Sequence, residues 1–239
     1  TQNGVIPLSI MLPIDQVGAR GKALSDNIQN DFLTDARAYG TMFGWQSLHY
    51  PQGSYALFNV PVSSTKLIQY VINTQTGAWG KFTNQPAYCW SLYNGDLYFG
   101  GAGGIVYKAD TGTSDAGGNI EWRIKPAFNY FGSRGVNKLF SMIRPHFTSN
   151  GSPAFAIDLN VDFSNKAPTS IPTAATLTAA LWDTAKWDTG LWSDTTEIAN
   201  YLTITGFGTS ATPIIRGADN GLVISFTAWD IILQPGNAL

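Results

Sequence analysis

The sequence predicts an all-β protein, with partial β-propeller-like blades in its first half, an antiparallel β-sandwich in its second half and one short helix. Between residues 44 and 110, short runs of aromatic and β-branched residues alternate with tight turns such as Asn94-Gly95-Asp96, which is the pattern of a β-meander. After a Gly/Ser/Thr-rich stretch at 111–118, the strand-like runs become longer. This change predicts two domains, at 1–112 and 119–239.

The first domain is expected to begin with an apolar segment and the helix. Residues 4–14 are apolar and bounded by prolines, which predicts a short strand whose prolines lie at a sheet edge or at a strand end. The helix is expected near 25–37, with Ser25 as its cap. Its apolar side chains recur at four-residue spacing, and they are Ile28, Phe32 and Ala36.

Seven short strands are expected after the helix, and they amount to about two propeller blades. Their expected bounds are 45–50, 54–60, 67–73, 78–82, 88–93, 96–100 and 104–108. Trp79 and Tyr98 lie within these strands, and we expect both to be structural or interface anchors. The run Gly100–Gly104 precedes a strand-like segment. We therefore interpret it as a hairpin turn, since a phosphate-binding loop would need a helix directly after it.

The second domain is expected to contain six longer strands. Their expected bounds are 120–130, 138–148, 154–163, 201–207, 214–216 and 222–233. Residues 155–163 alternate, so Phe155 and Ile157 belong to one face while Asp158 and Asn160 belong to the other. We expect the face that carries Asp158 and Asn160 to be solvated, as in an antiparallel sandwich.

A patterned loop at 181–194 interrupts these strands. Trp182, Trp187 and Trp192 recur in it every five residues, a spacing that matches neither a helix nor a strand. We interpret the three indoles as anchors of a tightly turned loop at an inter-subunit or inter-domain contact. Two other interpretations stay open: binding of a glycan or calcium, and carbohydrate hydrolysis by the neighbouring carboxylates. Those carboxylates are Asp183, Asp188 and Asp194.

The composition favours a subunit of an assembly. Charged residues make up only 13% of the 239 residues, and 14 basic against 16 acidic residues give a formal net charge of −2. A surface with so few charges is usually covered by other subunits. The sequence has no basic run that would favour nucleic acid, and no apolar run as long as a membrane span.

The cysteine and histidine residues do not indicate a catalytic or metal centre. Cys89 is the single cysteine, so no disulfide forms within one chain, and we expect it to be a small buried residue. His49 and His146 lie in aromatic strand-like contexts without metal-ligand spacing, and we interpret both as structural. Arg134 and Lys138 are expected in solvent or at an interface. We expect no cofactor, no metal and no enzymatic activity.

Four motifs occur in an order that carries a family resemblance. They are Tyr70–Phe82, Asn94–Gly101, Val106–Gly112 and Phe128–Gly132. Together they resemble the tail nozzle or hub proteins of short-tailed bacteriophages, also called packaged-DNA stabilisation proteins. The loop at 181–194 and the terminal segment 231–239 are similar to the ending of that family.

The resemblance implies a non-enzymatic virion protein that forms a hexameric ring in the phage tail, below the portal and adaptor. Such a ring extends or closes the DNA channel for genome retention and ejection. It is assembled in the host cytoplasm, and its implied partners are other copies of the chain, portal-proximal adaptor proteins and tail fibres or spikes. Genomic DNA passes through it without sequence-specific binding, and the chain is not inserted in a membrane.

Family members join a propeller to a sandwich platform. Because two blades cannot close a propeller, we expect either further blades before Thr1 or a reduced remnant of one. Two alternatives remain. The first is a carbohydrate-binding or depolymerising tail spike or lectin-like module, and the second is a cellular propeller scaffold.

Overall fold

A computed structural model describes residues 4–7, 23–168 and 196–236. The described residues are mostly strands in antiparallel sheets, with one short α-helix, so the predicted all-β class is confirmed. The chain divides into two compact units, Thr1–Thr111 and Gly112–Leu239.

The first unit is built on a four-stranded meander. Its strands are β1 (Gln46–Tyr50), β2 (Tyr55–Pro61), β3 (Leu67–Asn73) and β4 (Trp79–Phe82), and they lie in this order in the sheet. Six consecutive residues of β3 are buried, which indicates that both faces of this strand are covered. One face packs against the helix and the other against a second sheet.

The second sheet is a three-stranded meander. It consists of β5 (Cys89–Tyr93), β6 (Asp96–Gly100) and β7 (Val106–Lys108). The turn between β5 and β6 is the two-residue type that Asn94-Gly95 predicts, because both residues have positive φ, at 53° and 88°. The Gly-rich run joins two strands as expected, although Ala102–Gly104 forms a short 3₁₀ turn, η2.

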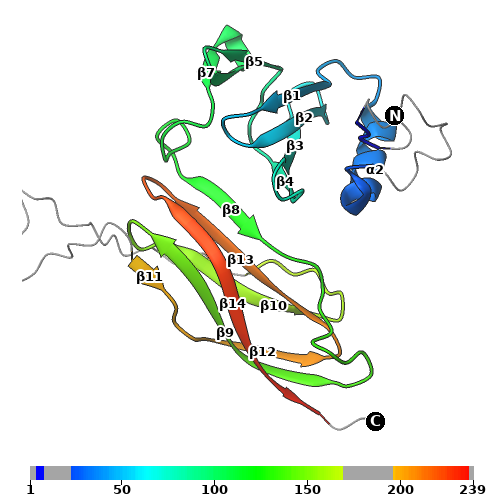
Figure 1. Ribbon diagram of the computed structural model, residues 1–239, viewed down its shortest axis with the longest axis vertical. Coiled ribbons are helices and arrows are strands. Elements are labelled where there is room, and N and C mark those ends of the chain that lie inside the picture. Colours follow the sequence, from blue (N-terminus) through cyan, green and yellow to red (C-terminus); the bar gives the residue numbers. More distant parts are fainter. Residues whose placement is uncertain (1–3, 8–22, 169–195, 237–239) are drawn as a thin grey trace, which may run out of the picture. The chain divides into compact units, whose positions relative to one another are not determined.

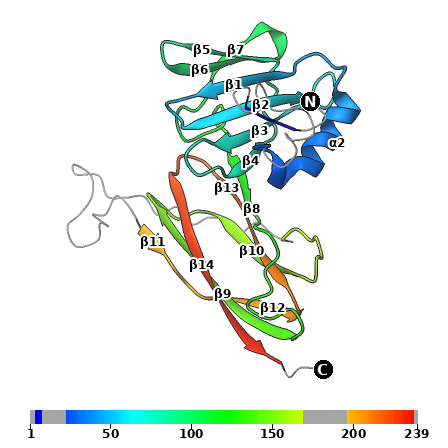
Figure 2. The ribbon, with the colours of Figure 1, turned by 45° about the vertical axis from the view of Figure 1, so that its right-hand side comes forward.

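The two sheets stack face to face on a small apolar core. Leu57 and Val71 from the first sheet meet Trp90 and Leu97 from the second, and Leu57 and Leu97 are fully buried. Asn59 and Gln69 are fully buried beside this core, and Gln69 Nε2 donates a hydrogen bond to Asn59 Oδ1 at 2.8 Å. The first unit is therefore a pair of stacked, propeller-like blades that do not close (Figure 2).

The helix covers the other face of the first sheet. It is α2 (Gln29–Tyr39), and one 3₁₀ turn, η1 (Asp26–Ile28), precedes it. Phe32 is the buried residue of the predicted stripe and packs edge-on against Tyr70 at a ring distance of 5.5 Å. The Tyr70 hydroxyl donates a hydrogen bond to Asp35 Oδ2 at 2.6 Å. Desolvation and this bond raise the pKa of Tyr70.

The structure contradicts the expected helix cap and, over residues 4–7, the expected first strand. Ser25 does not cap the helix, because its buried hydroxyl accepts a hydrogen bond from the Val5 amide at 2.9 Å. Residues 4–7 form no strand, and the rest of the expected strand lies outside the described residues.

The second unit is a sandwich of two antiparallel sheets (Figure 1). In one sheet β13 (Ala211–Asp219) lies between β10 (Phe155–Val161) and β8 (Ile120–Ile124). In the other, β9 (Lys138–Ser149) is central. Its neighbours are β14 (Ile224–Pro235) on one side, and β12 (Leu202–Gly208) and β11 (Thr196–Ile198) on the other.

The core of the sandwich draws on both sheets. Phe140 and Ile143 of β9 are fully buried and pack with Leu159 of β10 and Ile204 of β12. Gly206 of β12 allows the sheets to approach closely, because a Cβ there would lie 2.7 Å from the Leu159 side chain.

Two expectations about this unit need correction. The strand expected at 120–130 ends at Ile124, since Pro126 follows and its carbonyl oxygen accepts a hydrogen bond from Thr212 Oγ1 at 2.8 Å. The polar face of β10 is not solvated throughout. Asn160 is only 1% exposed, because the chain folds back so that its side chain bonds both backbone groups of Lys166.

Candidate functional site

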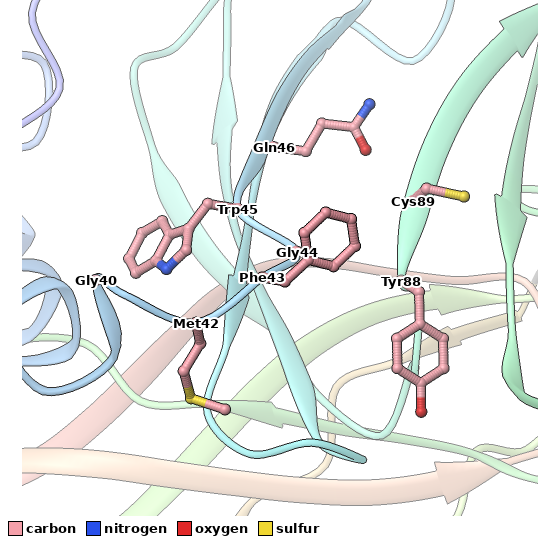
Figure 3. A pocket seen from close by; sticks show the side chains of 8 residues that line it. All are labelled: Gly40, Met42, Phe43, Gly44, Trp45, Gln46, Tyr88 and Cys89. Carbon is pink, nitrogen blue, oxygen red and sulfur yellow. The ribbon is translucent and has the colours of Figure 1, made fainter.

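An apolar hollow beside the helix end is the first candidate site (Figure 3). It has a volume of about 360 Å³ and is bordered by the turn after α2 and the start of β5. Phe43 projects from that turn with 95% of its surface exposed. A second hollow of about 280 Å³ shares Met42, Phe43 and Tyr88 with the first. These side chains suit contact with an apolar side chain of another protein.

The same hollow includes Cys89, which is exposed. The expectation of a buried cysteine is therefore wrong. In β5 the neighbouring Trp90 points into the core, so the alternation of side chains along a strand turns Cys89 to the outer face of the second sheet.

Tyr98 lies on that same outer face, where it is half-buried. Its ring contacts Tyr93 at 6.4 Å, and Tyr93 is 74% exposed. On the edge strand β7, Val106 is 70% exposed and Lys108 forms an ion pair with Asp96 at 2.7 Å. Tyr98 thus occupies a position that fits an interface anchor, which stays a prediction.

Trp79 occupies a different position from Tyr98, on the helix-covered face of the first sheet. It is half-buried, packs against Phe58 at a ring distance of 5.7 Å, and donates its indole N–H to the Leu24 carbonyl at 2.8 Å. These contacts fit a structural anchor within the unit. Trp182, Trp187 and Trp192 lie outside the described residues.

A charged cluster on the exposed face of the sandwich is the second candidate site. Asp230 of β14 accepts hydrogen bonds from the Arg144 guanidinium and contacts His146 Nε2 at 3.0 Å. The guanidinium also stacks over the ring of Tyr201 at 4.7 Å. Hydrogen bonding to His146 and Arg144 lowers the pKa of Asp230.

This cluster joins cross-strand neighbours rather than forming a cavity. Arg144 is the register partner of Asp230 on β9, and His146 is two residues further along the same strand. The structural interpretation of His146 fits this arrangement, whereas His49 of β1 is exposed. Pro145, between Arg144 and His146, lies where β9 has a partner strand on one side only, so its missing N–H fits that open side.

Lys138 is the residue that sequence reasoning most clearly missed. The expectation of a solvent or interface position is wrong, because Lys138 is only 2% exposed. Its Nζ donates to the carbonyl oxygens of Ser133, Val136 and Thr209 at 2.6, 2.9 and 3.1 Å. No local sequence signal indicates this role, because it depends on carbonyls from two separate segments. Arg134, by contrast, is exposed and stacks on Tyr130.

Within the described ranges, no group of three or more His, Cys, Asp and Glu side chains is arranged to hold a metal ion. In the same ranges no helix is long and apolar enough to cross a membrane. No protein-family model matches the chain, and a search of curated proteins finds no match either.

Proposed function

We propose that this chain is a structural, non-enzymatic subunit of a ring in the tail of a short-tailed bacteriophage, a nozzle or hub below the portal and adaptor. In this role it extends or closes the DNA channel, retains the genome and releases it at ejection. Its partners are further copies of itself, the adaptor proteins above it and tail fibres or spikes outside it.

The order of the stacked blades and the sandwich is the observation that carries this proposal. Three motifs of the resemblance occupy the blades: one spans β3 to β4, one begins at the turn before β6, and one contains β7. The turn in the first motif is organised by Asn73, whose Oδ1 accepts hydrogen bonds from the Gln75 and Thr76 amides, both at 2.9 Å. The first two motifs thus include turns of the two meanders, and the third includes the last strand of the second one.

The surface also suits a subunit of a closed ring. Exposed apolar side chains lie on both units, including Phe43, Val106 and Phe207 at 95, 70 and 65% exposure. In a cyclic assembly the same patch is covered in every copy. The affinity of a protein for DNA rises with the number of phosphates that it neutralises. A net charge of −2 without a basic run therefore favours weak binding, which would let a DNA duplex slide through the channel.

Single-particle electron microscopy of the purified full chain tests the proposal. We expect sixfold rings with a central channel. Monomers or trimers would contradict it, and trimers whose tryptophan fluorescence is quenched by host polysaccharide would favour the tail-spike alternative. In a separate binding assay we expect DNA duplexes to bind weakly.

A further inference from the structure

Within the described part of the chain, one edge of the strand β14 is unpaired along its whole length. Eleven of its twelve residues pair with β9 on one side, and no described residue pairs with them on the other. None of its twelve side chains is buried, whereas half of the positions on β9 are. An edge of this length presents a row of free backbone N–H and C=O groups to another strand.

The β14 edge carries few of the features that normally keep strand edges apart. Asp230 is its single ionisable residue and is engaged by β9, and its proline stands only at the end. A bulge at Thr227, which has no register partner, bends the strand locally. Beyond it, Ala228–Ile232 pairs with β9 without interruption. This five-residue run is thus open to a further strand.

The core-facing residues of β14 are also incompletely covered. Trp229, Ile231 and Leu233 pack against the sandwich core but are only partly buried. On the opposite face, Ile232 is 40% exposed beside Met142, its β9 register partner, which is equally exposed. A strand placed beyond β14 would bury the remaining apolar surface of these side chains.

The opposite edge of the same sheet spans the same stretch of β9 as β14, with a gap at 144–146 between its two strands. It consists of β12, paired with 138–143, and β11, paired with 147–149, so it reaches along β9 as far as β14 does. Leu202–Gly208 contains no ionisable residue, and Phe207 is 65% exposed. The strands β12 and β14 are both antiparallel to β9, so the two edge strands run in the same direction.

We propose that β14 of one copy pairs with the β12/β11 edge of the next copy, which continues the sheet head to tail from subunit to subunit. The inference rests on the proposed ring and supplies its subunit contact. A closed ring of this kind needs two different, complementary surfaces on each copy, and the sheet has two such edges. Self-pairing of β14 centred on Ala228–Ile232 would instead place Asp230 opposite Asp230 of the partner, which repulsion between like charges disfavours.

Lysine substitutions at the two edges test whether they form the contact. Thr227→Lys on β14 and Thr205→Lys on β12 each place a charge at an exposed edge position. Each should raise the protein concentration needed for half-assembly by about tenfold or more. The matched control is Thr148→Lys, at an exposed position of the central strand β9. It should leave assembly unchanged, and the melting temperature of each of the three variants checks that it folds.

Crosslinking tests the head-to-tail direction. In a Cys89→Ser background, single cysteines on β14 are mixed with single cysteines on β12 and treated with a short bismaleimide. Crosslinks between the two variants are expected, and a β14 variant alone should give none. The positions, all exposed, are Ser225, Thr227 and Gln234 on β14, and Thr203 and Thr205 on β12.

The outcomes separate the contact from the proposed function. Sixfold rings that give no β14–β12 crosslink, or that form equally well with both edge lysines, would overturn this contact and leave the ring standing. Crosslinking of a β14 variant to itself would overturn the head-to-tail direction. Heterologous crosslinks in open filaments would support the contact while contradicting the nozzle.

Discussion

The side chain of Gln46 bonds both backbone polar groups of Trp90. Its Nε2 donates to the Trp90 carbonyl at 2.7 Å, and its Oε1 accepts from the Trp90 amide at 2.7 Å. Gln46 lies on β1 and Trp90 on β5. The side-chain amide of Gln46 therefore hydrogen-bonds the backbone of Trp90 as a neighbouring strand would. It links the two stacked sheets of the first unit.

Replacing Gln46 by Leu should loosen this link. The substitution leaves the amide and the carbonyl of Trp90 without these partners, so we expect the free energy of unfolding to fall by about 1–3 kcal/mol. Urea unfolding followed by tryptophan fluorescence measures the change. Ser47→Ala, at an exposed position of the same strand, is the control and should change stability little. Equal stability of Gln46→Leu and the control would show that the link is dispensable.

Asn59 should contribute more to the stability of the first unit than its neighbour Gln69. The Asn59 amide donates to the Gly44 and Ala87 carbonyls, and its Oδ1 accepts from Gln69 Nε2 and from the Trp90 indole. No described residue donates a hydrogen bond to Gln69 Oε1. We expect Asn59→Leu to destabilise the first unit by about 3 kcal/mol and Gln69→Met by about 1 kcal/mol. Chemical denaturation of the two variants compares them, and the reverse order would contradict the network described.

Replacement of Lys138 by Met should destabilise the second unit. It removes the donor shared by the Ser133, Val136 and Thr209 carbonyls, and we expect a loss of about 3 kcal/mol. The matched control is Arg134→Met, which removes a basic residue from an exposed position of the loop that precedes β9. Thermal unfolding compares the two variants. An equal loss of stability in the control would argue against a specific role for the bonds from Lys138 to the three carbonyls.

The pairing of Asp230 predicts a pH dependence of stability. Hydrogen bonding to His146 and Arg144 lowers its pKa from the ordinary value of 3.8. The stabilisation that the ionised Asp230 provides is therefore complete above the ordinary pKa. It is lost as the pH falls through the lowered pKa of the folded state. Asp230→Asn should remove that part of the acid-induced loss, whereas the exposed Glu121→Gln on β8 should not. Unfolding measured from about pH 6 down to pH 2 distinguishes them, and identical profiles for wild type and Asp230→Asn would contradict the prediction.

Two aromatic substitutions contrast a packed residue with an exposed one. Trp79 is half-buried and hydrogen-bonded, so Trp79→Ala should destabilise the first unit by about 2–3 kcal/mol, below the range for a fully buried tryptophan. Phe43 is 95% exposed, so Phe43→Ala should lower the free energy of unfolding by less than about 0.5 kcal/mol. Differential scanning calorimetry measures both. An unchanged melting temperature for Trp79→Ala would refute its role as an anchor of the sheet.

The sequence by itself determined the strands of the first unit and the fold class, because these depend on local signals. The turn at Asn94-Gly95 needs two positive φ angles that Asn and Gly adopt readily. Side-chain alternation then fixed the strands on either side of it. The same local signals predicted a strand at 222–233, which is close to β14 (Ile224–Pro235).

Only the tertiary structure decided which side chains are covered and which edges stay open. Lys138 is buried because carbonyls from both 133–136 and Thr209 converge on it. Cys89 is exposed because Trp90 takes the core side of β5. The sequence predicted β14 but not its position at the edge of its sheet. The order of strands in a sheet depends on pairing between residues that are distant in the chain. The local pattern of residues does not predict such pairing.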